Sequence, residues 1–335
     1  MTAQRILFIK PSNSSFVLRD EQLLQKHHPI KSFLYRYGSW HRHLLSTLQL
    51  SLWLCHHLWR ARVLFIWFSD YHSWLPILLA SLLRKRTFLC VAGYDVACLP
   101  ELNYGVFVRP FRGWCSRFSL RHADVLLPVA RSLVEDIAVQ VGKVRGSIQV
   151  VPFGFSEQRW YPAKTGEENL VLTVAFGDDL RRVRIKGLDL FCEAARALPE
   201  IRFMVIGPTG AAERFLQEQQ LNNVQLLGPQ PAEKLLAYYQ SATVYAQFSI
   251  REGLPNAVIE AMLCGCIPVG TRTGGIPDAI EDVGKIVTER TCAAAVAAIR
   301  WALQQPASRR QEIRSHAIAH FSERRREQAL QSLLD

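Results

Sequence analysis

The chain of 335 residues is 49% hydrophobic and 21% charged, which excludes an intrinsically disordered protein and matches two packed domains of ordinary size. Its eight cysteines lack the paired spacing of a disulfide framework or a zinc site, so we expect a reducing, cytoplasmic compartment. Since Met1 leads directly into a strand-like apolar run, we also expect no signal peptide.

The net charge of +11 is concentrated in one half of the chain. The first 160 residues hold 20 Lys and Arg against 9 Asp and Glu, whereas the rest of the chain holds 20 of each. We therefore expect the first half to meet an anionic or interfacial partner, such as the surface of an anionic membrane. Nucleic acid is not expected, because the chain has no zinc-finger, RNP or leucine-zipper pattern.

Short apolar runs alternate with helix-like segments along the whole chain. They occupy residues 6–9, 63–68, 87–91, 125–129 and 148–153 in the first half, and 170–175, 202–206, 224–227, 244–248, 267–269 and 285–287 in the second. Continuous apolar runs are typical of strands buried on both faces. Their alternation with helices predicts an α/β protein with two doubly wound, Rossmann-like domains.

Proline, glycine and charged residues cluster between about 153 and 167, which indicates a domain link. We predict an N-terminal domain at 1–158 and a C-terminal domain at 159–335. The latter ends in a helix at about 308–335, and packing of this helix back on the N-terminal domain is one expectation. The charged run at 323–327 is interpreted as a solvated face. Two such domains facing each other across a cleft suit the transfer of a group between two substrates.

Residues 44–59 form the longest segment without formal charge. At about 16 residues with several polar side chains, this segment is too short for a transmembrane helix, which needs about 20 apolar residues. Tryptophans within it and arginines around it fit an interfacial helix, but an amphipathic helix whose apolar stripe faces a domain core is the preferred interpretation. Both interpretations stay open.

The densest chemistry lies in the second half, where a loop runs into a helix after the strand at 244–248. Glycine in such a loop lets backbone approach a ligand, proline suits the first helical turn, and the N–H groups of that turn favour phosphate. A carboxylate one turn into the helix lies roughly 6 Å along the axis from its tip, a position suited to accept hydrogen bonds from the two ribose hydroxyls of a nucleotide. A carboxylate ahead of the helix is suited to accept from hydroxyls of the sugar itself. The residues concerned are Glu252, Gly253, Leu254, Pro255, Asn256 and Glu260.

Glu252 and Glu260 form an E-x7-E pattern, and the sequence Glu-Gly-Leu-Pro-Asn-x3-Glu-Ala-Met closely resembles the family 4 glycosyltransferases, which are retaining enzymes of the GT-B fold. The resemblance covers about residues 170–290, including Lys186-Gly187 and Thr273-Gly274-Gly275. It implies that the C-terminal domain binds a UDP- or GDP-sugar and that the N-terminal domain binds a hydroxyl acceptor. The acceptor hydroxyl would attack the sugar from the same face as that from which the diphosphate leaves.

The resemblance also implies that Lys186 and a nearby arginine hold the donor diphosphate. Arg181, Arg182 and Arg184 all precede Lys186, and Arg184 is the preferred candidate. One cation 4 Å from the growing negative charge is worth about 4 kcal/mol at an effective dielectric of about 20, or roughly a thousandfold in rate. Because the chain has no Asp-x-Asp pattern, we expect neither a metal nor a cofactor to be required.

Two features of the N-terminal half depart from the family pattern. The loop at 10–16 lacks the family's glycine pair, and Ser14 and Ser15 either take its place toward the donor or cap a helix. In the segment after the strand at 87–91, Ala92 replaces a family histidine while Gly93 and Asp95 remain. We expect Asp95 to serve the reaction, by binding the acceptor or by steadying the cleft.

Tyr94 and His72 are further acceptor-site candidates, although a structural histidine is the preferred interpretation of His72. The charge asymmetry suggests a lipid-linked or cell-surface polysaccharide precursor as acceptor and a peripheral position on the inner face of the membrane. The alternatives are a non-catalytic, sugar-nucleotide-binding partner subunit, and an epimerase or phosphorylase of the same fold. An NAD-dependent oxidoreductase is disfavoured, since no G-x-G-x-x-G follows a strand.

Overall fold

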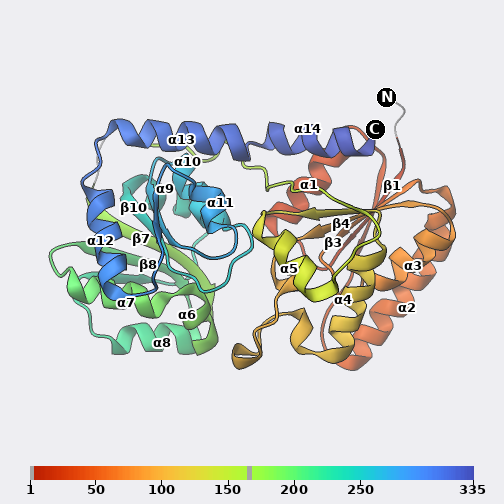
Figure 1. Cartoon of the computed structure of the whole chain (residues 1–335), viewed down its shortest axis with the longest axis horizontal. Coiled ribbons are helices and arrows are strands. Elements are labelled where there is room, and N and C mark those ends of the chain that lie inside the picture. Colours follow the sequence, from red (N-terminus) through yellow and green to blue (C-terminus); the bar gives the residue numbers. More distant parts are fainter. Residues whose placement is uncertain (1–3, 164–167) are drawn as a thin grey trace. The chain divides into compact units, whose positions relative to one another are not determined.

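The computed structural model describes residues 4–163 and 168–335 and divides into two compact units (Figure 1). One unit comprises Met1–Gly154 with Arg324–Asp335, and the other comprises Phe155–Glu323. Each is built on a sheet of six strands, and all the strand pairs of both sheets are parallel. The prediction of two parallel α/β sheets is therefore confirmed. Residues 164–167 of the predicted domain link lie outside the described residues.

The first sheet has a core of continuous apolar strands. Its order is β2 (Ile30–Leu34), β1 (Ile6–Lys10), β3 (Val63–Trp67), β4 (Arg86–Val91), β5 (Val125–Pro128) and β6 (Ser147–Ile148). Every residue of β1 and β3 is buried, and Phe8, Phe65 and Phe88 stack across β1, β3 and β4 at centroid distances of 5.4 and 6.3 Å. Strand β2 was not predicted, because at the edge of the sheet its residues are only half-buried or exposed and form no continuous apolar run.

Helices cover both faces of the first sheet, with α1 and α14 on one face and α3 and α4 on the other (Figure 1). The helices of this unit are α1 (Ser15–Gln25), α2 (Trp40–His57), α3 (Trp74–Leu82), α4 (Pro110–His122), α5 (Ser132–Val141) and α14 (Glu323–Leu334), with short 3-10 turns η1 (Leu58–Arg60), η2 (Tyr94–Val96), η3 (Pro100–Leu102) and η4 (Val106–Val108).

Helix α14 is fixed to the first unit by a buried ion pair. Arg326 is 2% exposed, and its guanidinium donates to both carboxylate oxygens of Asp20 in α1, at 2.6 and 2.5 Å. It also donates to the carbonyl oxygens of Val151 and Pro152. The interpretation of residues 323–327 as a solvated face is thus wrong for Arg326, because its partner lies 306 residues earlier in the chain.

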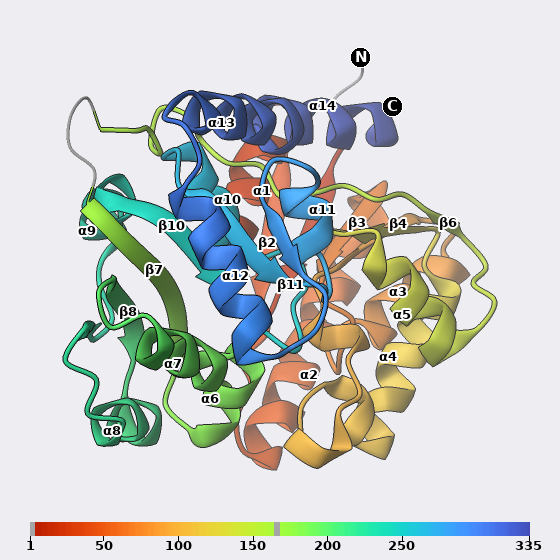
Figure 2. The same cartoon turned by 60° about the vertical axis from the view of Figure 1, so that its left-hand side comes forward.

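The second sheet has the order β12 (Lys285–Val287), β11 (Ile267–Thr271), β10 (Ala242–Gln247), β7 (Glu168–Gly177), β8 (Arg202–Pro208) and β9 (Val224–Leu227). Helices α7 and α8 cover one face and α9 and α10 the other (Figures 1 and 2). The helices of this unit are α6 (Leu180–Lys186), α7 (Leu188–Ala197), α8 (Gly210–Glu218), α9 (Ala232–Ser241), α10 (Asn256–Leu263), α11 (Ile276–Ile280), α12 (Cys292–Leu303) and α13 (Ser308–Phe321).

The segment predicted as one helix at about 308–335 forms two helices, α13 and α14, on either side of Ser322. Ser322 has extended backbone, and Phe155 pairs with it as in a parallel bridge. The amide of Phe155 donates to the carbonyl oxygen of Phe321 at 2.7 Å, and the amide of Glu323 donates to the carbonyl oxygen of Phe155 at 3.1 Å. In a continuous helix, the carbonyl oxygen of Phe321 and the amide of Glu323 would instead form hydrogen bonds within the helix.

Among the helices described, none combines the length and the apolarity that crossing a membrane requires. Helix α2 has 18 residues and includes most of the uncharged segment 44–59. The expectation that this segment is not a transmembrane helix agrees with its structure.

Candidate active site

The site in the second unit begins where β7 ends and α6 carries Lys186. The side chain of Asp179 caps α6 by accepting from the amide of Arg182, and Gly187 ends the helix in the left-handed region at φ 70°. A Cβ on Gly187 would lie 1.9 Å from the carbonyl oxygen of Phe248, so only glycine fits this approach. The close approach brings the end of α6 against the segment that follows β10.

Lys186 and Glu252 meet at this approach. The ammonium of Lys186 lies 2.6 Å from Oε1 of Glu252, and the two side chains are 23% and 10% exposed. The same oxygen accepts from the hydroxyl of Ser249 at 2.9 Å and from the side-chain amide of Gln247 at 3.2 Å. The carboxylate of Glu252 is therefore held in place by two polar side chains as well as by the cation.

Two glycine-containing loops join beside Glu252. The amide of Gly275 donates to the carbonyl oxygen of Gly253 at 2.7 Å. Gly274, at φ 51°, packs so closely that a Cβ there would lie 2.0 Å from the carbonyl oxygen of Glu252. The segment Thr273-Gly274-Gly275, which the sequence only associates with the site by resemblance, is thus in direct contact with the backbone of the Glu252 loop.

Helix α10 starts one residue later than the proline pattern predicted, with Pro255 in the capping position and Asn256 as the first helical residue. Leu254 and Pro255 are buried, so their side chains shape the loop from inside. The side-chain oxygen of Asn256 is buried and has no hydrogen-bond partner among the described residues. A buried acceptor without a partner beside the N-terminus of a helix suits a polar ligand.

Glu260 lies one turn inside α10 and is half-buried. Its Oε2 accepts from the hydroxyl of Tyr239 in α9 at 3.1 Å. Burial raises the pKa of Tyr239 well above its ordinary value, which keeps that hydroxyl protonated and able to donate. The carboxylate of Glu260 is thereby oriented from the side of α9.

The three arginines before Lys186 have different environments. Arg184, the preferred candidate, is exposed and only two residues from Lys186, which places it on another side of α6. Arg182 is four residues from Lys186 and shares its helix face, and its side chain packs over Gly177 at the carboxyl end of β7. Arg181 pairs with Asp179 at 2.5 Å. The geometry favours Arg182 over Arg184 as the second cation.

In the first unit, Asp95 is fully buried behind the end of β4. Its carboxylate accepts from the amides of Ser69, Ala92 and Gly93 at 3.1, 3.1 and 2.8 Å. Burial raises the pKa of Asp95 to about 6, against the effect of the amide donors. These bonds tie the loops after β3 and β4 together, so they favour the steadying role over contact with an acceptor.

His72 is buried and both of its ring nitrogens are engaged, one with the carbonyl oxygen of Trp67 at 2.7 Å and one with the hydroxyl of Tyr37 at 2.9 Å. Burial lowers the pKa of His72, so the ring is neutral at neutral pH. This is the arrangement of a structural histidine, the second interpretation of its sequence position.

Tyr94 belongs to a polar group that the sequence did not reveal. Its hydroxyl accepts from Arg112 at 3.1 Å, and Arg112 forms a two-pronged ion pair with Asp70, which follows β3. The guanidinium also lies over the rings of Tyr37, Tyr71 and Tyr94 at 5.2 to 5.8 Å. The rule that ligands bind at the carboxyl ends of strands points to Asp70, but nothing in the sequence pairs it with Arg112 in α4.

Ser14 and Ser15 lie where β1 passes into α1. Ser14 occupies the capping position of α1, yet its side chain makes no capping hydrogen bond, and its hydroxyl lies 3.2 Å from that of Ser12. Helix α1 begins at Ser15. The hydroxyl of Ser14 is therefore not used for capping, and the role of both serines toward a donor stays a prediction.

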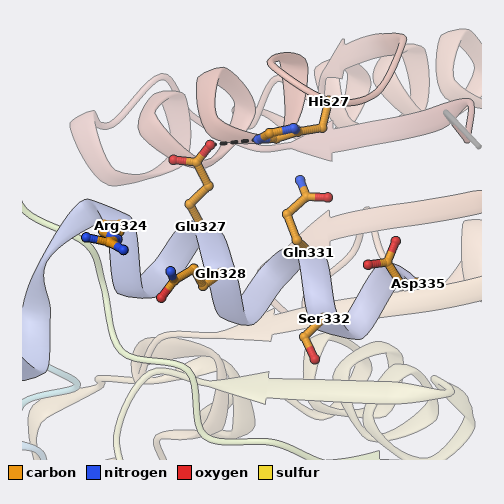
Figure 3. Close-up of a pocket in the computed structure, with 7 residues that line it drawn as sticks. All are labelled: His27, Arg324, Glu327, Gln328, Gln331, Ser332 and Asp335. Atoms are coloured by element: carbon orange, nitrogen blue, oxygen red, sulfur yellow. Dashed lines mark hydrogen bonds and ion pairs between the residues drawn. The ribbon is translucent and has the colours of Figure 1, made fainter. Parts of the chain in front are cut away.

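A separate pocket lies along α14 in the first unit (Figure 3). It has a volume of about 540 Å³, and Glu327 lies at its side, bonded to His27 at 2.7 Å. None of the predicted donor or acceptor residues lines it; the lining residues are His27, Arg324, Glu327, Gln328, Gln331, Ser332 and Asp335. The pocket is open to solvent and holds none of the residues assigned to a donor, so it is not a candidate nucleotide site.

The protein has two parallel α/β units, and a lysine and two glycine-containing loops lie at the carboxyl edge of the second sheet. These features define a protein of the GT-B fold class. Sucrose-phosphate synthase from Thermosynechococcus elongatus superposes with a TM-score of 0.82 at 18% identity, over 99% of this chain and 98% of that chain. HepE from Anabaena, solved with UDP-glucose, superposes with a TM-score of 0.73 at 15% identity, over 99% of each chain. At these identities the likeness shows the fold.

Residues 155–320 match the model of the family Glycosyl transferases group 1. Through this half, the chain belongs to that family, as the resemblance implied. Among curated proteins, it is 25% identical over 182 residues to one subunit of phosphatidylinositol N-acetylglucosaminyltransferase from Arabidopsis thaliana, and 28% identical over 190 residues to D-inositol 3-phosphate glycosyltransferase from Corynebacterium jeikeium. These matches cover 52% and 50% of this chain but only 40% and 45% of the relatives.

Proposed function

We propose that this protein is a retaining glycosyltransferase that moves a sugar from a UDP- or GDP-sugar to a hydroxyl acceptor. The observation that carries the proposal is the pairing of Lys186 with Glu252 beside the glycine loops and the first turn of α10. Family membership supports it, as do the names of the two curated relatives, both glycosyltransferases, and the HepE structures with UDP and UDP-glucose.

In this proposal, the donor changes the partners of Lys186. In the structure, the ammonium pairs with the carboxylate of Glu252. When the diphosphate binds, Lys186 turns to it and stabilises the negative charge that grows as the sugar–phosphate bond breaks. Glu252, still held by Gln247 and Ser249, then accepts from hydroxyls of the sugar. Arg182 supplies a second cation from the same face of α6.

The rest of the donor would be held by α10 and the acceptor by the first unit. Amides at the start of α10, with Gly253, receive the diphosphate, whereas the side-chain oxygen of Asn256 accepts from a hydroxyl of the donor and Glu260 accepts from the ribose hydroxyls. In the first unit, the group of Tyr94, Arg112 and Asp70 offers hydrogen bonds to an acceptor, whereas Asp95 and His72 keep the surrounding loops in place.

Neither a metal nor a cofactor is part of the proposed mechanism, since Lys186 and Arg182 supply the positive charge and the sequence has no Asp-x-Asp pattern. The acceptor proton is taken by the departing diphosphate oxygen, so two carboxylates flanking the bond, as in glycosidases, are not needed.

The direct test is incubation of the full chain with labelled UDP- and GDP-sugars, with and without lipid-linked and soluble sugar acceptors, in the presence of EDTA. Acceptor-dependent release of UDP or GDP with retained anomeric configuration would support the proposal. Binding of donor without any release would indicate a partner subunit. Conversion of the donor's sugar without an acceptor would indicate an epimerase, and loss of transfer in EDTA that added Mg²⁺ restores would refute metal independence.

Glu260→Gln should weaken binding of UDP or GDP by about tenfold or more, because a hydrogen bond to a charged group is worth about 1.5–3 kcal/mol. Isothermal titration measures the dissociation constant. Glu233→Gln, at an exposed position of α9, is the matched control and should bind as the unchanged protein does. An unchanged dissociation constant for Glu260→Gln would exclude the ribose contact.

We also propose that helix α2 meets the surface of an anionic membrane, which favours a lipid-linked acceptor. Trp40, Leu44, Leu48 and Leu52 are spaced four residues apart, and each is more than half exposed. The buried residues of α2 are Ser46, Leu50 and Leu54, on another side of the helix. Of the interpretations left open for this segment, the exposure favours the interfacial helix over a helix whose apolar stripe faces a core.

Positive charge accompanies this exposed stripe. A pocket of about 340 Å³ next to the end of α2 is lined by Arg5, Lys31, Arg60, His56 and His57, together with Leu7, Pro29 and Ile30, and it has no acidic residue in its lining. Trp59, beside Arg60, is 61% exposed, a position suited to the headgroup region of a bilayer. Apolar side chains flanked by cations complement an anionic lipid surface.

The triple substitution of Leu44, Leu48 and Leu52 by serine should lower partitioning onto phosphatidylserine-containing vesicles by at least about tenfold, since each leucine loses apolar burial. Sedimentation with vesicles measures this, and binding of the unchanged protein should fall as salt rises from low to about 0.5 M. Val139→Ser, an exposed apolar position of α5, is the control. Absence of binding at low salt would refute the proposal.

A further inference from the structure

A cluster of two histidines and a glutamate lies in the second unit, away from the residues proposed for the donor. His316 and His320 are one turn apart on α13, and their rings lie 4.3 Å apart between centroids. Glu281 caps the end of α11, and its Oε2 is 3.9 Å from Nδ1 of His316. One ligand atom from each of the three side chains lies within 4.8 Å of the others.

The hydrogen bond of His320 to the backbone suits metal binding by its other ring nitrogen. Nδ1 of His320 is 3.0 Å from the carbonyl oxygen of His316, one turn earlier, so this nitrogen carries the proton and Nε2 keeps a lone pair. A ring nitrogen that donates to a backbone carbonyl while the other faces a ligand is the usual arrangement of metal-bound histidine.

His316 also has an unused polar atom. Its side chain is 9% exposed, and Nε2 is buried without a hydrogen-bond partner among the residues that the structure describes. A buried polar atom without a partner costs free energy, about 1–3 kcal/mol, unless a ligand or an ion compensates it. The backbone of Glu281 adds a second unusual feature, a non-glycine residue at φ 44°.

We propose that Glu281, His316 and His320 bind a divalent transition-metal ion, with zinc as the preferred metal. Two imidazoles and one carboxylate form a recurrent zinc ligand set with one position left for water, and imidazole disfavours Mg²⁺ and Ca²⁺. Zinc at about 2.0–2.1 Å from each ligand holds the ligand atoms roughly 3.4 Å apart. Side-chain rotations would therefore bring the three ligand atoms of the present cluster to metal-binding distance.

The bound metal would join α13 to the end of α11. Helix α11 has only five residues, and its other end, at Gly275, is bonded to Gly253 of the donor loop. The metal would thus stabilise the short helix that supports that loop. The ligands of this site take no direct part in the proposed transfer, and zinc binding is measured without a donor.

The test is zinc binding by the full, tag-free chain after removal of metals by a chelator. Competition with a chromophoric chelator should give one zinc per chain, and Co²⁺ should produce the visible absorption of a low-symmetry site. His320→Gln and Glu281→Gln should each weaken zinc binding by about tenfold or more. Both positions are at least partly exposed, so the variants should fold.

His122→Gln is the matched control. Nδ1 of His122 lies 2.8 Å from the carbonyl oxygen of Phe118, one turn earlier, as Nδ1 of His320 does with His316. His122 belongs to no three-ligand cluster within the described part of the chain. This variant should bind zinc as the unchanged protein does. Zinc binding by His320→Gln at undiminished affinity, or no stoichiometric binding by the unchanged protein, would overturn the proposal.

Discussion

Replacement of Lys186 by alanine should lower kcat by about 10²–10⁴-fold while the fold stays intact. The ammonium lies in a partly buried pair with Glu252, and a cation about 4 Å from the leaving diphosphate is worth about 4 kcal/mol at an effective dielectric of about 20. Removal of one preorganised group that stabilises transition-state charge typically costs 10²–10³-fold in rate. Steady-state kinetics with the preferred donor measures kcat and KM separately.

The control for this substitution is Lys234→Ala, which removes an exposed lysine of α9 in the same unit and should leave kcat unchanged. Because Lys186→Ala leaves the carboxylate of Glu252 without its cation, the melting temperature of each variant should be compared with that of the unchanged protein. A decrease in kcat of tenfold or less, in a folded Lys186→Ala protein, would contradict the role of Lys186 at the diphosphate.

Arg326→Met should lower the free energy of unfolding of the first unit by about 3–5 kcal/mol. The side chains of Arg326 and Asp20 are only 1% and 2% exposed, so the substitution leaves a buried carboxylate without its cation. It also frees the carbonyl oxygens of Val151 and Pro152. Urea denaturation followed by tryptophan fluorescence measures the loss, since six of the eight tryptophans lie in this unit.

Two further variants separate the ion pair from other effects. Arg324→Met, at an exposed position of the same helix, should change the free energy of unfolding by no more than about 0.5 kcal/mol. The double variant Asp20→Leu with Arg326→Met should recover most of the loss, because apolar residues replace a buried pair at little cost. A loss of less than about 1 kcal/mol for Arg326→Met alone would contradict the account of how α14 is held.

The second unit was largely predictable because its strands are buried on both faces and its motifs lie close together in sequence. The apolar runs correspond to β7–β12, and the sequence predicts one site for Glu252 and Lys186, whose side chains lie 2.6 Å apart. Gln247 and Ser249, which hold Glu252, were missed. They are ordinary polar residues at the end of β10, and only their position at the carboxyl edge of the sheet marks them.

The choice among the arginines depended on helix phase. Without knowing that α6 is helical from Leu180 to Lys186, spacing alone does not show that Arg182 shares a face with Lys186 and Arg184 does not. The environment of the apolar face of α2 could not be predicted for a related reason. A stripe of leucines shows that a helix is amphipathic, but it does not show whether that stripe packs on a core or faces solvent.

Contacts between residues far apart in the chain were beyond sequence reasoning. The pair of Asp20 and Arg326 spans 306 positions, and Asp70, in the loop after β3, pairs with Arg112 of α4, 42 residues later. In the cluster of Glu281, His316 and His320, the spacing of the two histidines is visible in the sequence. The approach of Glu281 is not, because it depends on how α11 packs near α13.

Titration of nucleoside diphosphates into the full chain tests the donor site most directly. Isothermal titration with UDP, GDP and ADP should show one molecule of at least one of them bound per chain. That binding should weaken in Lys186→Ala and stay unchanged in Lys234→Ala. If none of the three binds at millimolar concentration, or if Lys186→Ala binds as tightly as the unchanged protein, the second unit does not hold a donor diphosphate in the way described.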